Sequence, residues 1–196
     1  MTFLADQRLD SVMTTKPRGR IIAGARPDQT LQVTITGKIT DISKAVAAIK
    51  ANPDVGKIVI EIDSAGGSIS ESGNLFNALL EHKAHVTVIV GKQCMSAALN
   101  ILMGGHRRLC QPDSVFMIHA PSHQLDRRES RYTAAELRRL ADQLEERAED
   151  ILEHLSCIKP EHRPFIEQAL MSFEGEVFGV EKAKELGLIH ATVDEG

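Results

Sequence analysis

The apolar positions of the chain switch repeatedly between a period of two and a period of three to four residues. Alternation, or a short apolar run, is typical of strands, whereas the longer period is typical of one helix face. The expected strands are residues 31–36, 57–63, 86–90, 114–119, 176–178 and 188–193, and the expected helices are 42–49, 69–80, 96–103, 133–156, 161–170 and 181–186. Strands that alternate with helices predict an α/β domain with largely parallel strand pairing.

The helix expected over residues 133–156 carries the longest apolar stripe of the chain. Its seven apolar positions are spaced three and four apart: Leu137, Leu140, Leu144, Ala148, Ile151, Leu152 and Leu155. A helix of this length is about 36 Å long, comparable to the diameter of a small domain. Part of the stripe therefore needs another surface, and we expect a homo-oligomer.

Composition narrows the class of protein. The chain has 196 residues, of which 42% are apolar and 26% charged, which is typical of a globular domain. We expect a polar, flexible arm over residues 1–20 and a single domain over 21–196. The longest apolar run, 97–103, contains Asn100 and is far shorter than a membrane span.

Charge and cysteine content exclude further classes. The net charge of −4 gives no electrostatic reason to expect nucleic-acid binding. The start of the chain lacks the apolar centre of a signal peptide. Three scattered cysteines are too few for a disulfide framework or a zinc site. We therefore expect a cytoplasmic protein without a metal.

Three places combine a strand end, a sharp turn and a polar side chain. Gly66-Gly67 follows an expected strand and exposes backbone N–H groups, although a plain tight turn would look the same. Ser96 opens an expected helix, where it could serve only as an N-cap. His119 ends an apolar strand and could be a half-buried structural histidine. Cys94 is a rival nucleophile that more readily packs as a small apolar group.

Taken together, the three places supply the parts of a nucleophilic site. A serine nucleophile needs a base for its proton and N–H donors for the oxyanion. Ser96, His119 and the Gly66-Gly67 turn provide one of each. All three lie at the carboxyl ends of expected parallel strands, where α/β sheets place their sites.

At these residues the chain resembles the proteolytic subunit of the Clp protease and its phage head-maturation relatives. The motifs that carry the resemblance are ITGKITD (35–41), IDSAGGSISESGNLFNAL (62–79), VTVIVGKQCMSAALNILMGG (86–105), QPDSVFMIHAPS (111–122) and VEKAKELGLIH (180–190). The resemblance implies a spiral of β-β-α units, as in the Clp and crotonase folds, with a long protruding helix at 133–156. It also implies Ser96 as nucleophile, His119 as base, and the amides of Gly67 and Ala97 as the oxyanion hole.

The chain departs from the family pattern around the site. Ala65 stands where the family usually has proline, and Gln93-Cys94-Met95 replaces small residues before the serine. The segment after the histidine is charged where the housekeeping enzymes are rich in glycine.

The third member of the triad is the largest departure. Gapless alignment places the family's aspartate at Gly175, which Glu174 and Glu176 flank. We expect Glu174 to be the acid, because it precedes the glycine and has the freer backbone. Glu176, or a Ser–His dyad without an acid, stays open.

The resemblance implies a serine endopeptidase that forms an acyl-enzyme inside an oligomeric ring and needs no cofactor. Its substrates would be peptides or unfolded proteins, and any use of ATP would belong to a partner AAA+ unfoldase. Two alternatives stay open: a catalytically silent ring or scaffold subunit, and an acyl-CoA enzyme of the crotonase type.

Overall fold

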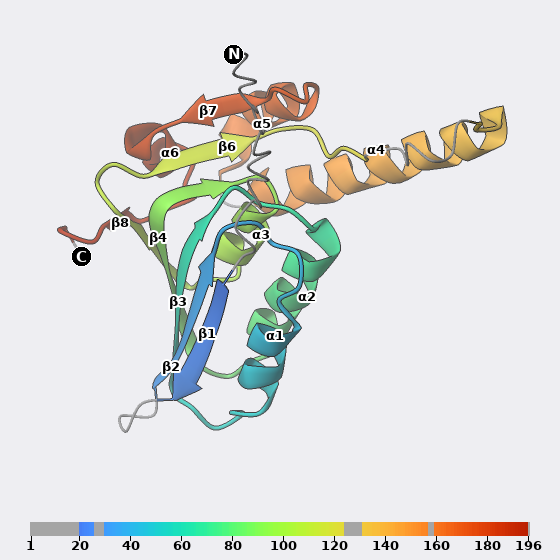
Figure 1. Cartoon of the computed structure of the whole chain (residues 1–196). Coiled ribbons are helices and arrows are strands. Elements are labelled where there is room, and N and C mark those ends of the chain that lie inside the picture. Colours follow the sequence, from blue (N-terminus) through green and yellow to red (C-terminus); the bar gives the residue numbers. More distant parts are fainter. Residues whose placement is uncertain (1–19, 26–29, 124–130, 157–158, 196) are drawn as a thin grey trace, which may run out of the picture.

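The computed structural model describes residues 20–25, 30–123, 131–156 and 159–195. They form a mixed α/β structure around one eight-stranded sheet (Figure 1). The flexible arm expected over residues 1–20 lies outside the described residues, apart from Arg20, which begins the first strand. No helix among the described residues is both long enough and apolar enough to cross a membrane.

The strands and helices follow the predicted alternation. The strands are β1 (Arg20–Ala25), β2 (Thr30–Thr36), β3 (Lys57–Ser64), β4 (His85–Met95), β5 (Arg107–Cys110), β6 (Val115–Ile118), β7 (Glu176–Phe178) and β8 (Ala191–Thr192). The helices are α1 (Ser43–Lys50), α2 (Ile69–Leu80), α3 (Ala98–Met103), α4 (Ala134–Ser156), the 3₁₀ helix η1 (Pro160–His162), α5 (Arg163–Leu170) and α6 (Val180–Glu185).

Strand pairing confirms the largely parallel sheet. The order is β1-β2-β3-β4-β5-β8, and every pair in it is parallel except β1 with β2. Strand β4 serves two partners: Thr87–Val90 pairs with β5, and Gln93–Met95 pairs with β6. Strand β7 then pairs antiparallel with β6. The sheet therefore divides at β4, which separates β6 and β7 from the main row of strands (Figure 1).

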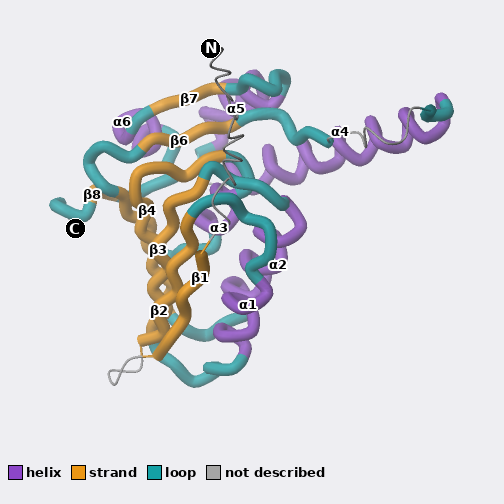
Figure 2. The backbone as a smooth tube through the Cα atoms, viewed as in Figure 1, coloured by secondary structure: helices purple, strands orange, loops and turns teal. Residues whose placement is uncertain are grey.

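Helices α1, α2 and α3 lie together on one side of the sheet (Figure 2). The residues that alternation predicted to face the core, Leu31, Val33 and Ile35, are buried, and β3 repeats the pattern. Together with the parallel sheet and the long helix, this arrangement confirms the expected fold class. The carboxyl ends of β3, β4 and β6 are left to carry loops.

Helix α4 leaves the rest of the chain (Figure 1). Near its end, Leu152 and Leu155 are buried against the body, whereas Leu137 near its start is 44% exposed. The chain itself thus covers only one end of the predicted apolar stripe.

The last strand is shorter than the pattern predicts. A strand was expected over 188–193, but the Leu188 N–H donates to the Ala183 carbonyl (2.9 Å), which continues the turn that ends α6. Only Ala191–Thr192 then reaches β5. Apolar content alone could not distinguish a buried helix end from a strand.

Strand β5 was not predicted, because two arginines open it. Arg107 is exposed, but Arg108 is buried. The Arg108 guanidinium donates to the carbonyls of Gly105 (2.9 Å), Gly187 (3.0 Å) and Leu188 (2.8 Å). This side chain therefore ties the segment after α6 to β5, and the view of Arg107-Arg108 as solvated charge is wrong for Arg108.

Arg108→Met is expected to lower the free energy of unfolding by about 2–4 kcal/mol, because buried carbonyls lose a charged donor. Arg107→Met, at the exposed neighbouring position, is the matched control and should change stability by less than about 0.5 kcal/mol. Urea unfolding followed by circular dichroism measures both. Equal stabilities for the two variants would contradict the role assigned to Arg108.

Candidate active site

A cleft of about 770 Å³ opens at the carboxyl ends of β3, β4 and β6. Its lining residues come from the loop after β2, the turn after β3, the turn after β4 and the segment after β6: Gly37, Lys38, Ile39, Thr40, Ala65, Gly66, Gly67, Ser68, Ile69, Gln93, Ser96, His119, Pro121 and Ser122. The structure thus brings Ser96, His119 and the two glycines together, as expected from the strand ends.

The turn after β3 is held by a buried serine. The Ser64 hydroxyl donates to the Gly37 carbonyl (2.6 Å) and accepts from the Gly66 N–H (3.0 Å). Gly67, with φ of 146°, pairs with Ile39, and a Cβ on it would lie 2.1 Å from the Ile39 carbonyl oxygen. Glycine is therefore required for this approach of two backbone segments.

Sequence reasoning did not single out Ser64, although a signal was present. Residues 58, 60 and 62 of β3 are buried isoleucines, and the same period of two places Ser64 on the buried side. A buried hydroxyl needs hydrogen-bond partners. The alternation thus marks Ser64 as a residue that organises the neighbouring turn.

Ser96 lies in a sharp turn between β4 and α3. Its φ is 54°, and it is the one residue other than glycine in the described segments with a positive φ. The Ser96 N–H donates to the Met117 carbonyl (2.9 Å), which ties the turn to β6. A left-handed backbone is unfavourable for serine, so the surrounding structure must hold it.

Helix α3 begins two residues later than predicted. It starts at Ala98, with Ala97 as its N-cap and no side-chain capping bond. The alternative that Ser96 is merely an N-cap is therefore wrong. Its hydroxyl stands before the helix, at the cleft.

Cys94 is unsuited to be the nucleophile. It is fully buried in β4, and burial raises the pKa of its thiol far above the ordinary range. A thiol that stays protonated is a poor nucleophile. This agrees with the expectation that Cys94 packs as a small apolar group.

Two backbone amides beside Ser96 have no protein acceptor. Among the hydrogen bonds of the described residues, the N–H groups of Gly67 and Ala97 donate to none. Gly66 packs between them, since a Cβ on it would lie 3.1 Å from the Ala97 nitrogen and 2.7 Å from the Ser96 Cβ. The amides can therefore serve a ligand in the cleft.

His119 follows β6 and presents its ring to the cleft. Its Nδ1 is buried and has no hydrogen-bond partner. Gly175, the position that alignment gave to the family's aspartate, does lie against His119: a Cβ there would lie 2.4 Å from the His119 Cβ and 2.1 Å from the Ile118 oxygen. The position is next to the base, but it carries no carboxylate.

The flanking glutamates do not bond to the ring. Glu174 is exposed, and its N–H donates to the Ser172 hydroxyl (3.1 Å). Glu176 is half-buried in β7, opposite Ile118. Neither supplies an acceptor for His119 Nδ1, which stays without a partner.

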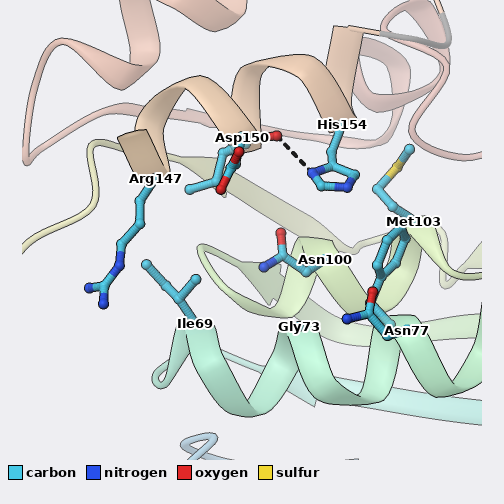
Figure 3. A pocket seen from close by; sticks show the side chains of 10 residues that line it. Ile69, Gly73, Asn77, Asn100, Met103, Arg147, Asp150 and His154 are labelled. Carbon is cyan, nitrogen blue, oxygen red and sulfur yellow. Dashed lines mark hydrogen bonds between the residues drawn. The ribbon is translucent and has the colours of Figure 1, made fainter. Parts of the chain in front are cut away.

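A smaller pocket of about 170 Å³ adjoins the cleft, and Ile69 lines both cavities (Figure 3). Its walls come from α2, α3 and α4: Ile69, Gly73, Phe76, Asn77, Asn100, Met103, Arg147, Asp150, Ile151 and His154. The His154 ring packs edge-on against Phe76, with centroids 5.0 Å apart, and its Nδ1 bonds to the Asp150 carbonyl. The pocket is thus largely apolar, with polar groups contributed mainly by α3 and α4.

The described residues contain no group of three or more histidine, cysteine, aspartate or glutamate side chains arranged to hold a metal ion. The chemistry of the cleft has to be sought in its own side chains and amides.

Comparison with known proteins identifies the relatives of the chain. The family model described as Clp protease matches residues 28–195. A search of curated proteins gave no significant match. The matched segment contains every residue of the cleft.

Gly66→Ala is expected to lower the free energy of unfolding by about 2 kcal/mol, because the residue has φ of 88° and its Cβ would collide with the Met95 carbonyl. Gly56→Ala is the matched control, since nothing lies within 4 Å of a Cβ there. Thermal unfolding compares the two variants. A Gly66 variant as stable as the Gly56 variant would show that the turns after β3 and β4 are not in close contact.

Proposed function

The chain belongs to the Clp protease family, and on that premise we propose that it is a serine endopeptidase that cleaves peptide bonds through an acyl-enzyme. The observation that carries the proposal is the turn at Ser96. It holds a serine in an unfavourable left-handed conformation, in one cleft with a histidine and two unengaged amides. Strain of this kind is typical of functional positions.

The proposed mechanism assigns one role to each group. Ser96 Oγ attacks the carbonyl carbon of the scissile peptide while His119 Nε2 takes its proton. The amides of Gly67 and Ala97 donate to the oxyanion that forms. The intermediate collapses to the acyl-enzyme as His119 gives the proton to the leaving amine. Water, activated by His119, then releases the acyl group and restores Ser96.

For the third member of the triad we propose Glu174 ahead of Glu176. Glu174 is exposed, so its side chain is free to turn, whereas Glu176 is held in β7. In the conformation described, His119 Nδ1 has no acceptor, and Ser96 and His119 would act as a dyad. A carboxylate would stabilise the imidazolium and raise the rate beyond that of the dyad.

The unpartnered His119 Nδ1 and the glycine at position 175 also favour a second candidate function, a catalytically silent scaffold subunit. An acyl-CoA enzyme would use the same two amides to stabilise an enolate, but it has no need of a serine in a strained turn. Reaction at Ser96 distinguishes the peptidase from both alternatives.

We further propose that the chain assembles into a ring-shaped homo-oligomer whose chamber receives peptides or unfolded proteins. The projecting start of α4, with Leu137 44% exposed, is the surface that needs a partner. Any ATP-driven unfolding would be supplied by a separate AAA+ partner. Both described cysteines, Cys94 and Cys110, are free thiols, which supports a cytoplasmic location.

A fluorophosphonate probe should modify Ser96 and no other residue, as read by mass-spectrometric mapping. Ser96→Ala should abolish the modification, and His119→Ala should slow it by more than about 10³-fold, since members of one catalytic unit fail together. Ser122→Ala is the matched control, because Ser122 lines the same cleft. It should react like the wild type.

Absence of any labelled serine in a folded wild-type chain would favour the scaffold subunit. Labelling that survives Ser96→Ala but not Cys94→Ala would transfer the nucleophile to Cys94. Binding of a CoA ester by an unlabelled chain would favour the crotonase-type enzyme.

Assembly has its own test. Light scattering should give a mass several times 21.5 kDa at micromolar concentration. Leu140→Lys together with Leu144→Lys should dissociate the assembly, because charges would replace the uncovered part of the stripe. Exchanging exposed Glu145 for lysine is the control and should leave the mass unchanged. A monomeric wild-type chain would contradict the ring.

A further inference from the structure

The ring of His119 lies perpendicular to the ring of Phe173. Their centroids are 5.7 Å apart, and the planes meet at 82°. Phe173 is 68% exposed, so the body of the chain does not bury it as a core residue. Perpendicular aromatic contacts at this separation are attractive and depend on ring orientation.

The backbone on both sides of Phe173 is fixed to the segment that carries His119. On one side, the Ser172 carbonyl accepts from the Ala120 N–H (2.9 Å). On the other side, Gly175 lies so close to Ile118 and His119 that no Cβ could be accommodated. These two attachments set the place of Phe173 beside the ring, so the contact does not depend on a freely moving loop.

We propose that Phe173 is a positioning residue for His119, whose ring it orients where no carboxylate does. The inference rests on the proposed function of Ser96 and His119. For Nε2 to accept the serine proton, the neutral ring must carry its own proton on Nδ1. That atom is buried without a hydrogen-bond acceptor. The face of a neighbouring aromatic ring is the remaining weak acceptor, through an N–H to π contact.

Charged groups near the ring set the competing explanations. Lys38 lines the cleft, Glu174 neighbours Phe173 in sequence, and Glu176 lies opposite Ile118 in β7. Either glutamate could instead orient the ring if its side chain turned towards Nδ1. The test therefore has to separate the aromatic ring from the two carboxylates.

The experiment compares Phe173→Leu and Phe173→Tyr in the full chain. Leucine keeps an apolar side chain and removes the ring, whereas tyrosine keeps the ring and can leave its hydroxyl in solvent. Met171→Leu, at a position that is 87% exposed, is the matched control. The readouts are the second-order rate of Ser96 modification by a fluorophosphonate and the ¹⁵N signals of the His119 ring.

Phe173→Leu should slow the modification about three- to tenfold, the range expected for one aromatic pair. Phe173→Tyr and Met171→Leu should react like the wild type. The ¹⁵N signals should show the Nδ1-protonated ring in the wild type and in Phe173→Tyr, and a mixture of both tautomers in Phe173→Leu. A merely structural role for Phe173 would not move the tautomer.

Unchanged rate and tautomer in Phe173→Leu would overturn the proposal, as would equal losses in Phe173→Leu and Phe173→Tyr. A larger loss in Glu174→Gln or Glu176→Gln than in Phe173→Leu would assign the orientation to that carboxylate. If wild-type Ser96 does not react at all, the proposed function fails. The ¹⁵N comparison then still decides whether Phe173 orients the ring.

Discussion

The contact between two backbone turns, one after β3 and one after β4, is the constraint on which the cleft depends. Gly66 touches the segment from Met95 to Ala97 with no room for a side chain. This approach places the Gly67 amide and the Ser96 hydroxyl in one cleft, although they are far apart in sequence. Ser64 fixes the first turn through its bonds to Gly37 and Gly66, and β6 fixes the second through the Met117 carbonyl. The geometry of the cleft is therefore a property of the sheet that carries both turns.

Periodicity predicted most of the fold, because burial on one face leaves a direct mark on the sequence. It failed where a different interaction overrode the pattern. Arg108 gave β5 a polar appearance, although its guanidinium is satisfied by three carbonyls. The apolar segment at Leu188 is instead part of the turn that ends α6. In both cases the deciding partners lie outside the local window that a pattern can read.

For the site, the sequence predicted which residues would meet but not how each is held. Strand ends were enough to place Ser96, His119 and Gly67 at one edge of the sheet. The unpartnered Nδ1 of His119 and the contact with Phe173 depend on how the segment from Ser172 to Gly175 folds onto β6. No spacing rule relates those segments, since β7 reaches β6 from the far end of the chain. The identity of the acid could not be settled from the sequence for the same reason.

The attachment of this late segment has a consequence for how the protein is made. Synthesis proceeds from the N-terminus, and early parts of a chain can begin to fold before later parts exist. Ser96 and the two glycines precede His119, but Ser172 and Gly175, which pack on the histidine segment, are added more than fifty residues after it. A nascent chain would therefore display its serine well before its base is held in place. Such an order keeps a newly made peptidase inert beside the unfolded chains that surround it during translation.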